Sequence, residues 1–127
     1  MPKQADTRLS IFKGREAKLN RAIIEILTLQ GSLTIPELRK QIAKRKGLEE
    51  TYYASLFKRV RRLEETGYVR AIVKAEESRT QAYEVRPKAV LAIFLDAYSL
   101  QQILDKANDR QAARALLVLL DVILLED

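Results

Sequence analysis

The segment over residues 51–66 separates into two faces when it is read at helical spacing. At about 100° per residue its apolar side chains fall on one stripe, formed by Tyr53, Leu56, Val60 and Leu63. Polar side chains lie roughly opposite, namely Thr51, Ser55, Lys58 and Arg62. Gly67 follows where a helix needs a closing residue. The pattern predicts a helix that is anchored by one face and presents cations on the other.

A first helix is predicted over residues 15–30, closing at Gly31. Its inward positions are apolar at helical spacing: Leu19, Ala22, Ile23, Ile26 and Leu27. Residues 1–14 are polar and carry three cations, Lys3, Arg8 and Lys13. We expect these residues to form a flexible basic arm.

A second helix is predicted over residues 35–46, after a short extended connector at residues 32–34. Thr34 and Glu37 fit a capping box, in which each side chain satisfies a backbone N–H group at the start of the helix. Pro36 suits the first turn. The inward positions are Leu38 and Ile42.

Beyond Gly67 the period changes from the helical value to one near 2. Residues 68–74 and 81–86 predict two strands, joined by a charged link that contains Arg79. Residues 87–127 return to helical spacing, with breaks near Ser99 and at residues 108–109. The chain is therefore predicted to be mainly α with a small β-hairpin.

The last predicted helix, residues 110–125, is apolar around most of its circumference. Arg110, Arg114 and Asp121 share one narrow stripe. The remaining positions include Leu116, Val118, Leu119, Leu120, Val122 and Ile123. A helix packed on its own domain needs only one apolar face.

A helix of this kind is either buried wholly within one subunit or placed between two subunits. The first alternative requires a core large enough to cover every side. We expect the local core to be filled already by Leu91, Phe94, Leu95, Ile103 and Leu104. The sequence therefore predicts a symmetric homodimer, with an interface through Leu116, Leu119, Leu120 and Ile123.

Charge is distributed unevenly along the chain. Residues 1–86 hold 19 Lys and Arg against 11 Asp and Glu, a net +8, whereas residues 87–127 hold 4 against 6, a net −2. A basic helix face is also common on ordinary solvated surfaces. The concentration of positive charge before residue 87 favours an anion-binding surface, and nucleic acid is the polyanion that such a surface fits.

The composition excludes several kinds of chemistry. The 127 residues include no Cys and no His, which removes thiol nucleophiles, disulfides, His-dependent acid/base pairs and the usual zinc sites. Three acidic pairs, at residues 49–50, 64–65 and 76–77, stand at element boundaries as ordinary surface charges. We expect no enzyme, cofactor or metal. With no apolar run of about 18 residues, we expect a cytoplasmic, nucleoid-associated protein without membrane contact.

Residues 15–86 resemble a winged helix-turn-helix domain, and the run LFKRVRRLEETGYV over residues 56–69 carries the resemblance most specifically. The positions that this family fills with core and turn residues are here Phe57, Val60, Leu63, Gly67 and Val69. Residues 78–89, SRTQAYEVRPKA, are similar to the wing of PadR-type and related regulators. Arg86 stands where a threonine is usual and Ala89 where a glycine is usual.

The resemblance implies that helix 51–66 enters the DNA major groove and that the wing, residues 68–86, lies on flanking DNA. The residues whose chemistry suits these contacts are Thr51, Ser55, Lys58, Arg59, Arg62 and Arg79. Lys44 and Lys46 either bind phosphate or complement the dipole of the preceding helix. Three tyrosines are expected to pack rather than to stack on bases, namely Tyr52, Tyr68 and Tyr83.

The sequence thus predicts a winged helix-turn-helix followed by C-terminal helices. Residues 15–86 form the DNA-binding domain and residues 87–127 a helical dimerisation region. The predicted function is that of a dimeric, sequence-specific regulator of transcription bound to double-stranded DNA. Two alternatives stay open: a protein-docking module of a transcription, replication or partition assembly, and an architectural DNA-binding protein that does not read sequence.

Overall fold

The computed structural model describes residues 9–73 and 81–124. The chain divides after Asp96 into two units, Met1–Asp96 and Ala97–Asp127. Within the described ranges, we find no helical stretch with the length and hydropathy of a membrane span.

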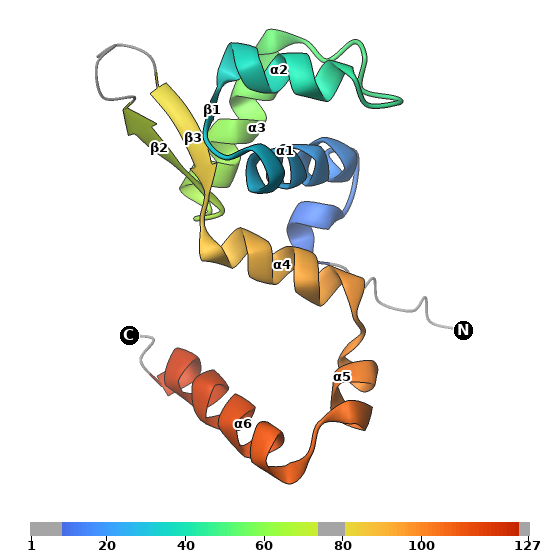
Figure 1. The fold of residues 1–127 in the computed structure, drawn as a ribbon, viewed down its shortest axis with the longest axis vertical. Coiled ribbons are helices and arrows are strands. Elements are labelled where there is room, and N and C mark those ends of the chain that lie inside the picture. Colours follow the sequence, from blue (N-terminus) through green and yellow to red (C-terminus); the bar gives the residue numbers. More distant parts are fainter. Residues whose placement is uncertain (1–8, 74–80, 125–127) are drawn as a thin grey trace. The chain divides into compact units, whose positions relative to one another are not determined.

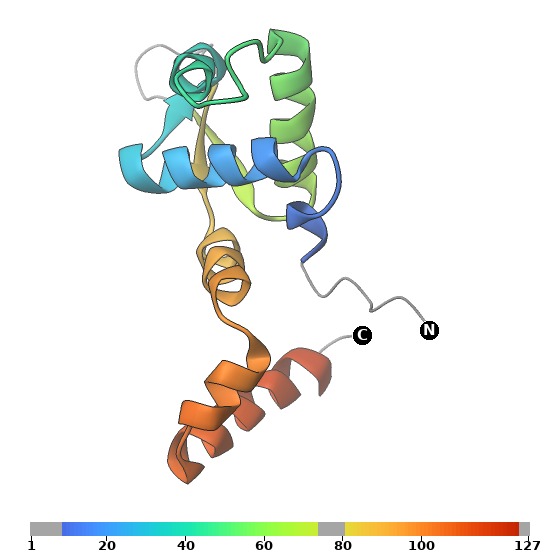
Figure 2. The same cartoon turned by 90° about the vertical axis from the view of Figure 1, so that its right-hand side faces the viewer.

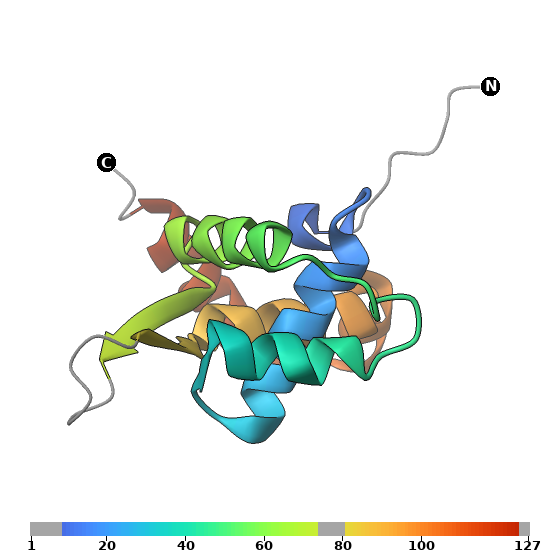
Figure 3. The same cartoon turned by 90° about the horizontal axis from the view of Figure 1, so that it is seen from above.

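Three helices form the body of the first unit (Figure 1): α1 (Ala17–Gln30), α2 (Ile35–Ala43) and α3 (Tyr53–Glu65). In Figure 2 and Figure 3, α1 crosses the other two helices. Their inward stripes are buried as predicted except at Tyr53, which is 49% exposed. The best-covered side chains are Ile23, Leu27, Leu38, Ile42, Leu56, Val60 and Leu63. Burial of each such side chain contributes about 1.5–3 kcal/mol, so this apolar core fixes the orientation of α3.

The ends of these helices follow the signals in the sequence. The Thr34 hydroxyl accepts a hydrogen bond from the Glu37 backbone N–H at 3.3 Å, and the Glu37 carboxylate accepts one from the Thr34 backbone N–H at 2.9 Å. The predicted capping box is therefore confirmed. After α3, Gly67 adopts a positive φ of 88°, and the Tyr68 N–H donates to the Leu63 carbonyl at 2.8 Å. This arrangement closes the helix and turns the chain into the sheet.

The sheet has three antiparallel strands in the order β1-β3-β2, formed by β1 (Leu33–Thr34), β2 (Val69–Val73) and β3 (Gln81–Val85). Tyr83 in the central strand lies opposite Leu33 on one side and Ala71 on the other. The predicted hairpin is confirmed, and the short connector before α2 adds the third strand.

The first described residues pack on the core instead of forming an arm. A 3₁₀ helix, η1 (Ser10–Phe12), buries Ile11 and Phe12 to 8% and 3% exposure. The buried Asn20 side chain donates to the Ile11 carbonyl at 2.9 Å, and the Arg21 guanidinium lies 4.4 Å from the centre of the Phe12 ring. The prediction of a flexible arm over residues 1–14 is wrong for residues 9–12, because the side chains of Leu9, Ile11 and Phe12 pack in or against the core.

The first unit also extends further than predicted, since α4 (Pro87–Ala97) packs on it. Ala89 and Ala92, one helical turn apart, are buried in the core of this unit. An ion pair between Arg21 and Asp96 ties the far end of α4 to α1. The unit therefore ends at Asp96, and not at residue 86.

The second unit contains α5 (Leu100–Lys106) and α6 (Asp109–Leu124). The predicted breaks between helices are confirmed. Ser99 caps the start of α5, and Asn108, just before α6, exchanges hydrogen bonds with Gln111 in the first turn of α6. No described residue of α5 or α6 is buried. The side chains expected to fill a local core are exposed instead: Leu91, Phe94, Leu95, Ile103 and Leu104. That expectation is wrong. The inward positions of α4 are Ala89 and Ala92, and α5 buries none of its described side chains.

Candidate nucleic-acid interface

The exposed face of α3 carries a polar and basic stripe. Leu56, Val60 and Leu63 are almost completely buried. Ser55, Lys58 and Arg62 are exposed on the opposite side, spaced by three and four residues so that they follow one line along the helix. The structure brings these three predicted site residues together on one face.

The connection before α3 holds the start of the helix in place. The Thr51 hydroxyl donates to the Leu48 carbonyl at 2.8 Å, and the Arg39 side chain donates to the Thr51 carbonyl at 3.2 Å. Because α3 begins at Tyr53, Thr51 lies just outside it. Its hydroxyl proton is already used, so Thr51 positions the helix and offers a ligand only an acceptor.

The four cations of α3 fall into two groups. Arg59 lies 3.9 Å from Glu16, and its side chain is only 27% exposed. Lys58, Arg61 and Arg62 are exposed, and within residues 9–73 and 81–124 they form no ion pair. Arg59 is therefore compensated by an acid, whereas the other three cations are available to an external anion.

The basic run at the end of α2 is also divided. Lys44 and Lys46 are exposed, whereas Arg45 between them turns to α1 and lies 2.5 Å from the Glu25 carboxylate. Lys44 caps α2, and its ammonium donates to the Gln41 side chain at 3.5 Å. Lys44 and Lys46 thus face solvent in the connection that leads to α3.

Both strands of the predicted wing are present, although Arg79 lies outside the described residues. Arg70 on β2 forms an ion pair with Glu84 on β3, at positions that face each other in the register. Arg86, which follows β3, is exposed and forms no ion pair within the described residues. The described part of the wing therefore has one compensated arginine, Arg70, and one available arginine, Arg86.

Tyr83 of β3 is a packing residue, as predicted, and is 2% exposed. Its phenol donates to the Gln81 side chain at 3.3 Å. Burial raises the pKa of the Tyr83 phenol above its ordinary value of 10.0, and the negative charge of Glu64 raises it further. Tyr83 is therefore neutral and has no role as a base-stacking platform.

Three aromatic side chains that the sequence assigned to the core lie at the surface. Tyr52, Tyr53 and Phe57 are 74%, 49% and 42% exposed, and we call this group the aromatic edge. The buried stripe of α3 is narrower than predicted, and Phe57 points about 100° away from Leu56. The helical spacing alone placed Phe57 outside the apolar stripe, whereas the family resemblance assigned Phe57 to the core.

The predicted dimer residues all lie on α6 and have exposed side chains. Leu116, Leu119, Leu120 and Ile123 are exposed, as is every described side chain of that helix. They form a large apolar surface on α6.

No protein-family model matches the chain, and no curated protein matches its sequence. Among solved structures, a mutant of MepR from a multidrug-resistant S. aureus clinical isolate is similar over 100% of this chain and 89% of its own, at 13% identity and a TM-score of 0.51. The fold is a winged helix-turn-helix. FabT of Streptococcus pneumoniae, in complex with DNA, gives 14% identity, coverage of 91% and 80%, and a TM-score of 0.46.

In this winged helix, α2 and α3 are the two helices of the helix-turn-helix. The strands β2 and β3 form the wing, and α4, α5 and α6 are the C-terminal helices.

Proposed function

We propose that the first unit binds double-stranded DNA with α3 in the major groove. One observation carries the proposal: the exposed stripe of Ser55, Lys58 and Arg62 lies opposite a fully buried stripe of the same helix. A helix held in this way can enter a groove about 12 Å wide while its cations reach phosphates and guanine edges. The net charge of +8 before residue 87 supports the same conclusion.

The residues take different parts in this proposal. Lys58 and Arg62 make the main contacts, Ser55 reaches phosphate or a base edge, and Arg59 adds a weaker contact after it leaves Glu16. Lys44 and Lys46 bind phosphate beside the groove. In the wing, residues 68–86, Arg79 is proposed to reach the adjacent minor groove.

We also propose that the protein acts as a homodimer through α6. Most of the stability of a protein helix comes from packing of its apolar side chains, and α6 leaves Leu116, Leu119, Leu120 and Ile123 uncovered. A second copy offers the same apolar surface, so the two surfaces are self-complementary. A dimer would present two α3 helices to two half-sites, which is the arrangement of a sequence-specific regulator of transcription. We also propose that the protein is related to PadR-type regulators and that it associates with the nucleoid.

The proposal is tested by titrating a duplex of about 30 base pairs with the protein at several salt concentrations and recording fluorescence anisotropy. We expect the logarithm of the affinity to fall linearly with the logarithm of the salt concentration, by about 0.9 for each phosphate contacted. Absence of binding at low salt would contradict DNA binding. Binding that is identical on every duplex would instead indicate an architectural protein.

The aromatic edge favours one second candidate. Tyr52, just before α3, and Tyr53 and Phe57 on it are exposed, and aromatic side chains are enriched at protein interfaces. A winged helix that docks on another protein would use this surface. Loss of a partner on substitution of Phe57, with no DNA binding in the titration, would support that role.

A further inference from the structure

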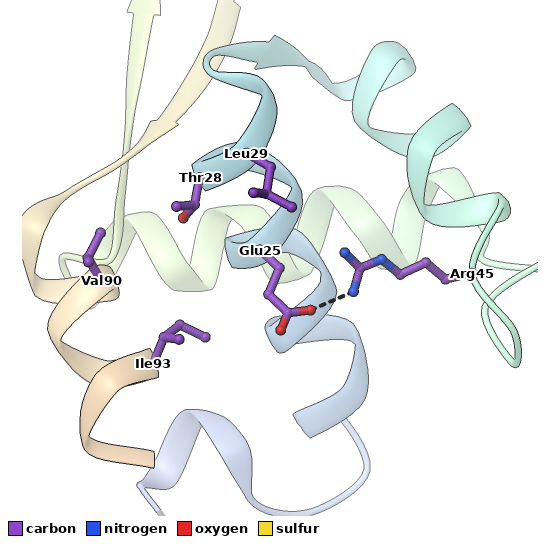
Figure 4. A pocket seen from close by; sticks show the side chains of 6 residues that line it. All are labelled: Glu25, Thr28, Leu29, Arg45, Val90 and Ile93. Carbon is purple, nitrogen blue, oxygen red and sulfur yellow. Dashed lines mark hydrogen bonds and ion pairs between the residues drawn. The ribbon is translucent and has the colours of Figure 1, made fainter. Parts of the chain in front are cut away.

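A cavity of about 370 Å³ opens beside α1 in the first unit. Its walls come from three elements (Figure 4): Glu25, Thr28 and Leu29 from α1, Arg45 from the connection after α2, and Val90 and Ile93 from α4. The volume lies near the lower end of the range of about 300–1,000 Å³ that holds small molecules in proteins. None of these residues belongs to the DNA-contacting stripe.

The cavity has an aliphatic wall. Leu29 is 80% exposed and Val90 is 48% exposed, and Ile93 lies beside them, partly buried against the core. None of the described residues that line the cavity is aromatic. An alkyl chain would remove this aliphatic surface from water, at a gain proportional to the apolar area covered.

The other end of the cavity carries a cation with spare donors. Arg45 uses one guanidinium nitrogen to reach Glu25 at 2.5 Å, and its side chain remains 35% exposed. Its further N–H groups donate to no acceptor within residues 9–73 and 81–124. The Thr28 hydroxyl already donates to the Ile24 carbonyl at 2.7 Å, so Arg45 is the lining residue suited to an anionic oxygen.

The negative charge of Glu25 does not make the cavity favour a cationic ligand. Its carboxylate lies near two guanidinium groups, those of Arg45 at 2.5 Å and Arg21 at 3.8 Å. A cationic ligand would have to compete with both arginines for Glu25. An anionic ligand can instead use the free edge of Arg45 and leave the existing ion pair intact.

The geometry points to a binding site for a small aliphatic carboxylate. The carboxylate accepts hydrogen bonds from the free edge of Arg45, and the alkyl chain lies along Leu29, Val90 and Ile93. We take hexanoate as the probe of this chemistry.

The site is connected to α3 through the backbone. The Arg45 carbonyl accepts from the Leu48 N–H at 3.0 Å, and the Leu48 carbonyl accepts from the Thr51 N–H at 3.2 Å, directly before the first turn of α3. A ligand that draws Arg45 toward the cavity therefore acts on the connection that positions α3. Resting on the proposed function, this coupling makes the carboxylate a regulator of DNA binding.

The site is tested by calorimetric titration of the full chain with hexanoate in the absence of DNA. Hexanamide and hexylamine serve as the neutral and cationic probes of the same length. We expect hexanoate to bind saturably, and hexanamide and hexylamine not to do so. In Arg45→Gln the affinity for hexanoate should fall about 10- to 100-fold, because a charged hydrogen bond is lost. Arg70→Gln, which also removes an ion-paired arginine of the first unit, is the matched control and should bind as the wild type does.

A second pair of variants tests the aliphatic wall. Val90→Glu places a negative charge at the cavity and should weaken hexanoate binding, whereas Val73→Glu, at an exposed valine of β2, should not. Equal binding by Arg45→Gln and wild type, preference for hexylamine, or no saturable binding up to about 10 mM would overturn the site.

DNA affinity is then measured separately, with and without saturating hexanoate. A protein that binds hexanoate but no DNA would refute the proposed function and leave the site standing. A protein that binds DNA with an affinity insensitive to bound hexanoate would refute the coupling alone.

Discussion

Arg59 of α3 lies 3.9 Å from Glu16, the residue that precedes α1. Lys58, its neighbour in sequence, is exposed and has no ion-pair partner in the described part of the chain. Consecutive residues of a helix point about 100° apart, so one residue step separates a compensated cation from an available one. Cations that the sequence alone treats as equal are thus distinguished by their surroundings.

The first prediction follows from this difference. Lys58→Ala and Arg62→Ala should each weaken DNA binding, by about 1–3 kcal/mol if the side chain contacts a base, or should lower the salt slope by about one unit if it contacts a phosphate. Arg59→Ala should have a smaller effect, because Arg59 must leave Glu16 before it can bind. Anisotropy titrations measure the affinities, with Lys106→Ala in α5 as the control. A larger loss for Arg59→Ala than for Arg62→Ala would reverse the assignment.

The second prediction concerns α6. Leu120→Asp would place a charge in the proposed dimer interface at a cost of several kcal/mol, and should give monomers that bind a single half-site weakly. Multi-angle light scattering measures the mass, and Gln111→Asp at a polar position of α6 should leave the dimer unchanged. Light scattering that finds the wild type monomeric at micromolar concentration, with α6 still helical, would refute the dimer.

The third prediction tests the width of the buried stripe of α3. Leu56 is 0% exposed and Phe57 is 42% exposed, so Leu56→Ala should lower the free energy of unfolding by about 2–5 kcal/mol, and Phe57→Ala by clearly less. Urea denaturation followed by circular dichroism gives both values. Equal losses of unfolding free energy in the two variants would show that Phe57 packs in the core.

The fourth prediction tests the packing of η1. Phe12 is 3% exposed, so Phe12→Ala should cost about 3–5 kcal/mol of stability, whereas Lys13→Ala should stay within about 0.5 kcal/mol of wild type. The same denaturation experiment applies. An unchanged free energy of unfolding in Phe12→Ala would mean that η1 does not pack on the core in solution.

The fifth prediction concerns alkaline pH. The raised pKa of Tyr83 means that the folded state holds the phenolic proton more tightly than the unfolded state does. Its contribution to stability is fully present below about pH 10 and is lost as the pH rises through the folded pKa. The free energy of unfolding should fall above pH 10, and less steeply in Tyr83→Phe. Identical slopes for the two proteins would show that Tyr83 does not contribute.

The sequence predicted the elements whose signals are local. The capping box of Thr34 and Glu37, the turn at Gly67 and the strands on either side of Arg79 depend on residues within a few positions of one another. The buried stripe of Leu56, Val60 and Leu63 followed from spacing alone.

The remaining features depend on contacts between distant parts of the chain. The burial of Phe12 requires α1 to lie beside η1, and the pairing of Arg59 with Glu16 joins α3 to the residue before α1. The attachment of α4 to the first unit depends on Ala89 and Ala92, whose small side chains give a weak hydrophobic signal. No local pattern contains these contacts, and the cavity beside Arg45 was missed for the same reason.

Selection of bound sequences from a pool of random duplexes tests the central claim most directly. We predict enrichment of a site with two half-sites about one helical turn, or 10 base pairs, apart, together with loss of that enrichment in the Lys58→Ala and Arg62→Ala double variant. A pool that is bound without enrichment, or an enriched site that the double variant binds as tightly as wild type, would contradict sequence reading by α3.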